Sequence, residues 1–226
     1  MPNSPVGTVL VTGAASGLGA AVVAAVRDAG GRALALDRVP VPGVPHEVVD
    51  LADTRAAEAA VKRVVDGAGG SLDAVFTAAG LDHCGALVDV DGADWDRVVM
   101  VNLLGTVAVV RAALPYLQAT GGKVVTVAGT LGHRVLPDAT AYCASRFGVV
   151  GFTRALHSEL KGQVGVTLLT ASFDDRAHRD DRDVPGPDAT LNRPEDVAQS
   201  VLHVLTRPPG CEITELVVAS PQGPWP

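Results

Sequence analysis

The chain has 226 residues, a formal net charge of −7 and 47% hydrophobic residues, which fit one globular α/β domain over residues 1–226 and exclude a disordered chain. The acidic balance argues against a nucleic-acid partner, and the sequence shows neither a signal peptide nor an apolar run near the roughly 18 residues of a membrane span, so we expect a cytoplasmic protein without membrane association. Its three cysteines lack the spacing of a metal site or a disulfide framework, and we expect no metal.

The first predicted strand ends in a glycine-rich turn. A β-branched, apolar run from Val9 to Thr12 leads into glycines at positions 13, 17 and 19, and a stretch without helix breakers follows. Glycines let backbone N–H groups approach a ligand, and a helix that begins here directs free N–H groups at phosphates. Such a turn can be purely structural, but the strand before it and the helix after it favour a nucleotide site. The expected contacts are Thr12, Gly13, Ser16, Gly17, Leu18 and Gly19.

The second predicted strand, Arg32–Leu36, stops at Asp37. An acid about 20 residues beyond such a turn has the position of a ribose-binding carboxylate, although it could also be an ordinary acid at a strand end. It would accept hydrogen bonds from both ribose hydroxyls and repel a 2′-phosphate. Arg38 follows directly and argues the other way, because an arginine can pair with that phosphate.

Strands and helices alternate along the rest of the chain. After a proline-rich loop, the pattern predicts further strands at His46–Val49, Leu72–Thr77, Lys123–Val127, Val164–Thr170 and Ile213–Ala219. Helices are predicted between them at Asp53–Asp66, Ala93–Ala119, Thr140–Lys161 and Pro194–Thr206. This order implies one doubly wound parallel sheet with helices on both faces, which binds its ligand at the carboxyl ends of the strands.

A tyrosine and an arginine lie one turn apart on the third of these helices. Tyr142 and Arg146 therefore project from one helical face. A guanidinium beside a phenol stabilises the phenolate, so the phenol can serve as general acid to a carbonyl oxygen or as general base to an alcohol. A surface tyrosine packed on an arginine stem is the alternative.

Taken in order, these features resemble the short-chain dehydrogenase/reductase family from about Val6 to Ala219. The resemblance rests on the glycine turn, the acid after the second strand, and the motifs Asp50-Leu51, Ala79-Gly80, Val101-Asn102-Leu103, Tyr142-x-x-x-Arg146 and Arg193-Pro194-Glu195-Asp196-Val197-Ala198. It implies a three-layer Rossmann-type sandwich. It also implies a small-molecule substrate and NAD as cofactor, with NADP disfavoured by Asp37.

The same resemblance assigns roles to residues. Tyr142 would give or take the proton, and Arg146 would reach the cofactor ribose. Asp50 and Leu51 would contact the adenine, and Ala79 and Gly80 would also bind the cofactor. Asn102 would perturb its helix and anchor a water in a proton relay. The two long helices resemble those with which the family forms homodimers and homotetramers.

Several positions depart from the family pattern. The active-site serine falls at Gly129, and the lysine one turn after the tyrosine is Arg146. Thr130 and His133 lie nearby and are the remaining catalytic candidates. The amide-rich motif after the fourth strand is reduced to Thr77-Ala78-Ala79-Gly80, and Ala171-Ser172 replaces the usual Pro-Gly. The charged segment within residues 171–192 is expected to be a solvated, variable substrate loop, and residues 1–5 a flexible terminus.

The sequence is compatible with three functions. The first is an NAD-linked oxidoreductase of alcohols and carbonyls with atypical catalytic residues. The second is a non-redox cyclase, isomerase or dehydratase, in which Tyr142, His133 or His83 does the acid–base work. The third is a cofactor-binding pseudoenzyme. A fold alone does not decide between them.

Overall fold

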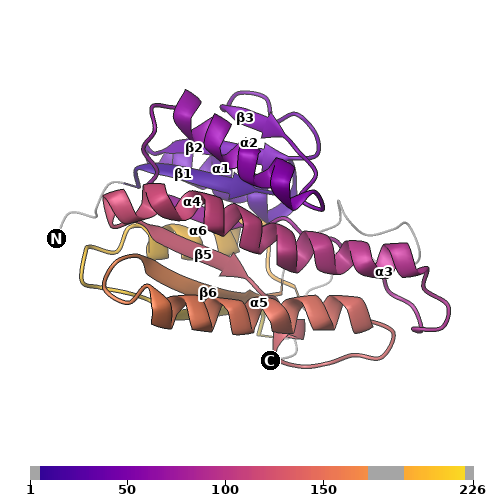
Figure 1. Ribbon diagram of the computed structural model, residues 1–226. Coiled ribbons are helices and arrows are strands. Elements are labelled where there is room, and N and C mark those ends of the chain that lie inside the picture. Colours follow the sequence, from indigo (N-terminus) through magenta and orange to yellow (C-terminus); the bar gives the residue numbers. More distant parts are fainter. Residues whose placement is uncertain (1–5, 173–190, 222–226) are drawn as a thin grey trace.

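The computed structural model describes residues 6–172 and 191–221 and places all their strands in one parallel sheet (Figure 1). The strands are β1 (Thr8–Thr12), β2 (Arg32–Asp37), β3 (His46–Val48), β4 (Ala74–Thr77), β5 (Lys123–Val127), β6 (Gly165–Ala171) and β7 (Glu215–Val218). Their order across the sheet is β3-β2-β1-β4-β5-β6-β7. The doubly wound parallel sheet predicted from the sequence is therefore confirmed. The expected flexible terminus at 1–5 and nearly all of the expected loop at 171–192 lie outside the described residues.

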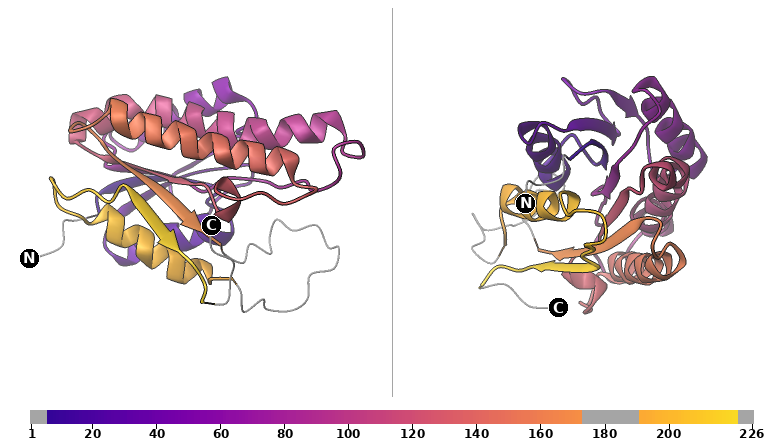
Figure 2. Two further views of the ribbon diagram at one scale, coloured as in Figure 1. Left: turned by 90° about the horizontal axis from the view of Figure 1, so that it is seen from below. Right: turned by 90° about the vertical axis from the view of Figure 1, so that its left-hand side faces the viewer.

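Helices cover both faces of the sheet and give three layers (Figure 2). One face carries α2 (Thr54–Gly67), α4 (Thr106–Thr120) and α5 (Thr140–Glu159), and the other carries α1 (Gly17–Asp28) and α6 (Pro194–Leu205). Successive side chains of a strand point to opposite faces. In β1, Leu10 therefore packs under α2 and α4, while Val9 and Val11 pack under α1 and α6. A strand buried on both sides must be apolar throughout, which explains its continuous hydrophobic run.

The long helix predicted at Ala93–Ala119 is divided into three segments. It begins as α3 (Gly92–Val99), is wound as a π-helix over Met100–Gly105, and continues as α4 with Pro115 inside it. By length and composition alone, Gly92–Thr120 could cross a membrane, contrary to the expectation from the sequence. However, 56% of its most apolar window is buried, and α4 packs against α2. It is a core helix of this fold.

The strand register brings the carboxyl ends of the central strands to one edge. Thr12 of β1 pairs with Leu36 of β2 on one side and with Thr77 of β4 on the other. On β4, Thr77 also pairs with Thr126 of β5. The segments that follow these strands therefore emerge together, and this edge carries the candidate site.

Candidate active site

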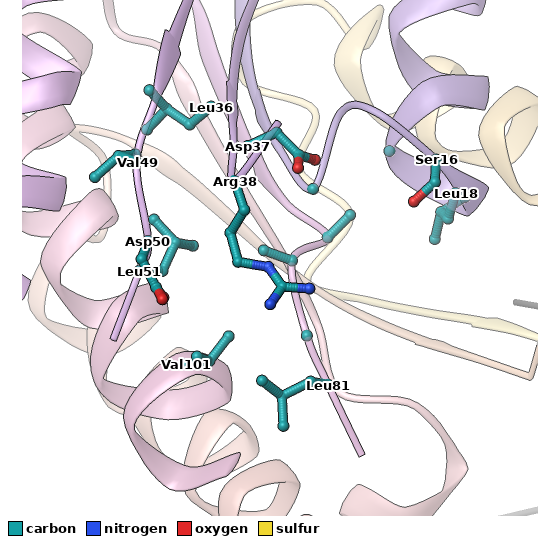
Figure 3. A pocket seen from close by; sticks show the side chains of 15 residues that line it. Ser16, Leu18, Leu36, Asp37, Arg38, Val49, Asp50, Leu51, Leu81 and Val101 are labelled. Carbon is teal, nitrogen blue, oxygen red and sulfur yellow. The ribbon is translucent and has the colours of Figure 1, made fainter. Parts of the chain in front are cut away.

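Two adjoining cavities lie along the carboxyl edge of the sheet. The first, called the turn cavity, holds about 580 Å³ of space, open solvent included, and is lined by Gly13, Ser16, Leu18, Gly19, Leu36, Asp37, Arg38, Val49, Asp50, Leu51, Ala78, Ala79, Gly80, Leu81 and Val101 (Figure 3). The second, called the tyrosine cavity, includes Asp82, Val127, Gly129, Thr130, Leu131, Tyr142, Arg146, Ala171, Ser172 and Leu191. Ala78, Gly80 and Leu81 line both, so the two form one cleft.

The glycine turn brings the backbone close to the first cavity. Gly13 has a φ of +66°, and a Cβ there would lie 2.9 Å from the Cα and N of Ala79. A Cβ at Gly19 would collide with the carbonyl of Gly13, so α1 can approach β1 only with glycine at that position. Ser16 precedes α1 without a side-chain cap. The first turn of α1 therefore offers N–H groups to the cavity, as expected for an anion site.

Two of the residues expected to contact a cofactor support the turn from outside the cavity lining. The hydroxyl of Thr12 accepts a hydrogen bond of 3.1 Å from the Ala79 N–H and so ties the end of β1 to the segment after β4. Gly17, with a φ of +49°, starts α1. Neither residue is among those that line the turn cavity.

Asp37 and Arg38 occupy different parts of the turn cavity. The Asp37 carboxylate accepts hydrogen bonds from the N–H of Ala15 at 2.9 Å and of Val39 at 3.2 Å, so it braces the glycine turn. The Arg38 side chain extends into the middle of the cavity between Asp37 and Asp50 (Figure 3). The turn cavity is therefore lined by one negative and one positive side chain, Asp37 and Arg38, on the side where the adenosine ribose is expected.

Asp50 is held by a partner that the sequence pattern does not indicate. Its carboxylate pairs with Arg97 of α3 at 2.5 Å and accepts a hydrogen bond from the Ala52 N–H at 3.0 Å. Partial burial opposes ionisation, but these hydrogen bonds and the charges of Arg97 and Arg38 outweigh it and lower the pKa of Asp50. Asp50 thus lines the turn cavity as a carboxylate anchored to α3.

Tyr142 and Arg146 form a stacked pair at the tyrosine cavity. The guanidinium carbon of Arg146 lies 4.8 Å from the centroid of the Tyr142 ring. Its Nη1 donates to the carbonyl of Val127 at 3.0 Å, and its Nη2 lies where a side chain at position 80 would be, so a larger residue at Gly80 would displace the guanidinium. Arg146 is only 7% exposed, and its buried Nε has no hydrogen-bond partner within the described residues. A buried, unpaired donor of this kind calls for a ligand.

Asn102 is fully buried in the π-helical segment and braces the strand end from below. Its Oδ1 accepts from the Leu81 N–H at 2.8 Å, and its Nδ2 donates to the Leu81 carbonyl at 2.9 Å and to the Ser145 hydroxyl at 3.1 Å. Its carbonyl accepts from the Thr106 hydroxyl. The side-chain amide is thus occupied within the protein and positions the segment after β4 against α5.

The β5 end lacks a hydroxyl where the family has one. Gly129 has φ +69° and ψ 176°, a combination essentially restricted to glycine. A Cβ built there would lie 3.8 Å from the Tyr142 hydroxyl and 3.7 Å from the Ala171 carbonyl, in ordinary contact. Thr130, which begins the short helix η2 (Thr130–Gly132), does line the tyrosine cavity.

The two candidate histidines do not line this cavity. Nε2 of His133 is 2.9 Å from the hydroxyl of Thr170 on β6. His83 is exposed, with its Nε2 3.7 Å from the Asp94 carboxylate on α3. Non-redox chemistry based on either imidazole therefore gains no support from their positions.

Asp82 lines the tyrosine cavity but was not among the predicted site residues, whereas Ser172 and Leu191 come from the segment 171–192 that was expected to be a substrate loop. The sequence did hold a signal for Asp82 and Ser172, because they follow the carboxyl ends of β4 and β6, where parallel sheets bind ligands.

The thiol of Cys84 lies beside Asp82. Partial burial and the nearby carboxylate raise the pKa of the Cys84 thiol to about 11. That thiol therefore stays protonated at neutral pH and is a poor nucleophile.

The sequence and the fold match known proteins. A family model described as short chain dehydrogenase matches residues 7–173. D-threitol dehydrogenase from Mycolicibacterium smegmatis is 34% identical over 180 residues, covering 72% of this chain and 67% of that protein. The structure of a metagenomic short-chain oxidoreductase in complex with NADP matches with a TM-score of 0.80 at 26% identity, over 95% of this chain and 97% of that one. The aldohexose dehydrogenase of Thermoplasma acidophilum has the same fold, with a TM-score of 0.87 at 20% identity over 97% and 96% of the two chains.

A parallel sheet with a glycine turn at one end of the cleft and a tyrosine–arginine pair at the other thus describes a dinucleotide-dependent oxidoreductase. The chain belongs to the short-chain dehydrogenase family, as the resemblance predicted.

Proposed function

We propose that this chain interconverts an alcohol and its carbonyl compound with NAD as cofactor and Tyr142 as the proton donor or acceptor. The observation that carries the proposal is the position of Tyr142. It lines the tyrosine cavity on top of a buried cation, and that cavity opens directly into the cavity of the glycine turn.

The residues present fit a nicotinamide dinucleotide along the cleft. The turn around Gly13 and Gly19 and the first turn of α1 suit the pyrophosphate. Leu51 and the Asp50 carboxylate suit the adenine, and the planar guanidinium of Arg38 could stack on that ring. The unpaired Nε of Arg146 suits a ribose hydroxyl at the nicotinamide end. When bound, the cofactor supplies or accepts the hydride.

The protein's own groups then handle the proton. The Tyr142 hydroxyl gives a proton to the oxygen of the substrate during reduction and takes one during oxidation. Arg146 is held by the carbonyl of Val127 and places its positive charge against the face of the Tyr142 ring. Asn102 acts indirectly, because its side-chain amide makes two hydrogen bonds that hold the backbone of Leu81 in place.

Asp37 supports NAD over NADP. Its carboxylate is fixed at the end of β2 by two backbone N–H groups, and a 2′-phosphate brought there would meet its charge. Arg38 is the opposing group, but its guanidinium lies in the middle of the cavity, away from the Asp37 carboxylate (Figure 3). The metagenomic short-chain oxidoreductase was solved with NADP, so titration of this chain with both cofactors tests the preference.

Absorbance of NADH tests the activity. The natural chain should oxidise NADH with at least one member of a panel of small ketones, aldehydes and keto sugars, or reduce NAD with D-threitol, the polyol named for the 34% identical relative. Tyr142→Phe should abolish that turnover while leaving NADH binding unchanged. If Tyr142→Phe retains the natural rate, the assignment fails and chemistry based on Thr130 becomes the better explanation.

We also propose a homodimer or homotetramer formed through the long helices. Leu104, which precedes α4, is 41% exposed, and Phe147 on α5 is 44% exposed, so both offer apolar surface to a second copy of the chain. Light scattering should show a multimer for the natural chain and a smaller species for Phe147→Glu.

The exposed cysteines Cys84 and Cys211 are free thiols, which fit the reducing conditions of a cytoplasm.

A further inference from the structure

A gap separates Tyr142 from the end of β6. The position of a Cβ at Gly129 has only two described atoms within 4 Å, the Tyr142 hydroxyl at 3.8 Å and the Ala171 carbonyl at 3.7 Å. Position 129, which follows β5, therefore places no side chain between the phenol and the end of β6. The residue that follows Ala171 borders the same cavity from the β6 side.

That residue is Ser172, and its hydroxyl is both buried and unused. Ser172 lines the tyrosine cavity, and its Oγ atom is buried without a hydrogen-bond partner within the described residues. An unpaired buried hydroxyl is costly in a native protein. Within the described residues the Thr77 hydroxyl is also buried and unpaired, but Thr77 lines neither cavity, so the position of Ser172 at the tyrosine cavity is what points to a partner from the substrate.

The backbone of Ser172 is fixed independently of any ligand. Its carbonyl accepts two hydrogen bonds from Asn192, from the N–H at 3.1 Å and from Nδ2 at 2.8 Å. The same Nδ2 donates to the carbonyl of Val218 on β7 at 3.0 Å. Asn192 thus clamps the end of β6 to β7, and a hydroxyl on a clamped backbone is suited to position a reacting group.

We propose that Ser172 is a catalytic residue, whose hydroxyl donates a hydrogen bond to the substrate oxygen beside Tyr142. This inference rests on the proposed function. In reduction, a hydride from the reduced nicotinamide forms the new C–H bond and the C=O electron pair moves to oxygen. That oxygen takes the Tyr142 proton, while Ser172 keeps its own and stabilises the developing negative charge. The second hydroxyl of the site thus comes from the end of β6.

Thr130 is the competing hydroxyl in this cavity. It also lines the tyrosine cavity, whereas its hydroxyl is not one of the buried, unpartnered atoms among the described residues. Burial therefore distinguishes the two hydroxyls, and matched variants of Ser172 and Thr130 decide which of them serves the substrate.

Four proteins distinguish the possibilities: the natural chain, Ser172→Ala, Thr130→Val and Tyr142→Phe. Each is measured for kcat and KM with the best carbonyl of the panel, for the Kd of NADH by calorimetry, and for Tm. Ser172→Ala should lower kcat/KM on the order of 10²-fold, mainly through kcat, with NADH affinity and Tm unchanged. Thr130→Val should change kcat/KM less than tenfold. Ser172→Thr, which keeps a hydroxyl, should recover most of the lost rate.

The possible outcomes distinguish a failure of the Ser172 assignment from a failure of the proposed function. If Ser172→Ala stays within threefold of the natural chain while Tyr142→Phe is inactive, the serine assignment is overturned and the proposed function stands. Loss of NADH affinity with an unchanged kcat would also overturn it, because Ser172 would then serve the cofactor. If the natural chain oxidises NADH with no carbonyl, or Tyr142→Phe remains active, the proposed function fails and this inference fails with it.

Discussion

The guanidinium carbon of Arg146 lies 4.8 Å from the centroid of the Tyr142 ring, so a buried cation stacks directly under the phenol. The hydrogen bond to the Val127 carbonyl holds it there, and Gly80 leaves the room for it. The guanidinium of Arg146, which stands where the family has a lysine, is therefore positioned by the end of β5 and by the segment after β4. Variants of Arg146 can measure how much its charge contributes to the rate.

Removing that charge should slow the reaction. Arg146→Met keeps an unbranched apolar stem but no cation, and we expect kcat for NADH oxidation to fall on the order of 10²-fold because no cation then faces the negative charge that develops on Tyr142 during proton transfer. Arg146→Lys keeps a charge without the planar stacking and should stay within about tenfold of the natural chain. Circular dichroism checks that both variants fold. An Arg146→Met variant with undiminished kcat would contradict the role of the cation.

Adding a side chain at Gly129 should destabilise the protein through its backbone. The site offers space, but φ +69° with ψ 176° is essentially a glycine conformation, and we expect a cost of about 1–3 kcal/mol. Urea unfolding of Gly129→Ser and Gly129→Ala measures it. The two variants should lose similar stability, since the strain comes from the Cβ that both share. A loss confined to serine would show that the hydroxyl and not the backbone is the cause.

Asp37 should control the choice of cofactor through its charge. Calorimetric titration of the natural chain should show tighter binding of NAD than of NADP. Asp37→Asn keeps an oxygen that can accept from Ala15 and Val39 but removes the charge, so it should narrow the preference as far as Asp37→Ala does. Should only the alanine variant change, the carboxylate acts by bracing the turn. Tighter binding of NADP by the natural chain would refute the preference.

Adding a side chain at Gly19 of the glycine turn should weaken cofactor binding. A Cβ at Gly19 would collide with the Gly13 carbonyl, so Gly19→Ala forces α1 away from β1 and should weaken NADH binding at least 10-fold. Gly151→Ala is the matched control, because it lies in α5 with nothing within 4 Å of the added carbon. That variant should bind NADH normally and gain about 0.5–1 kcal/mol of stability. Normal binding by Gly19→Ala would place the site elsewhere.

The pair of Asp50 and Arg97 should make stability depend on pH in the acid range. The folded-state pKa of Asp50 lies below its ordinary value of 3.8, so the carboxylate stabilises the fold above that value and loses this contribution as the pH falls through the folded pKa. Urea unfolding at several pH values should show Asp50→Asn less stable than the natural chain near pH 7. The difference should shrink below pH 4. A difference that is independent of pH would mean that the charge does not matter.

The periodicity of the sequence determined the fold and the ends of the cleft. Alternating apolar runs and glycine breaks placed β1, β2 and β5 within a residue of their true bounds, because these signals depend on neighbouring residues along the chain. The pairing of Tyr142 with Arg146 was also local, since one helical turn separates them.

The tertiary structure determined the hydrogen-bond and ion-pair partner of each side chain at the site. Arg97 holds Asp50, Leu81 and Ser145 occupy Asn102, and Thr170 holds His133 away from the cavity. None of these pairs is close in sequence, and a hydrogen bond between distant segments depends on strand order and helix docking, which local periodicity does not encode. The unused hydroxyl of Ser172 belongs to the same class. Its significance comes from the empty position at Gly129 across the cavity, and two different strands meet there only in the folded sheet.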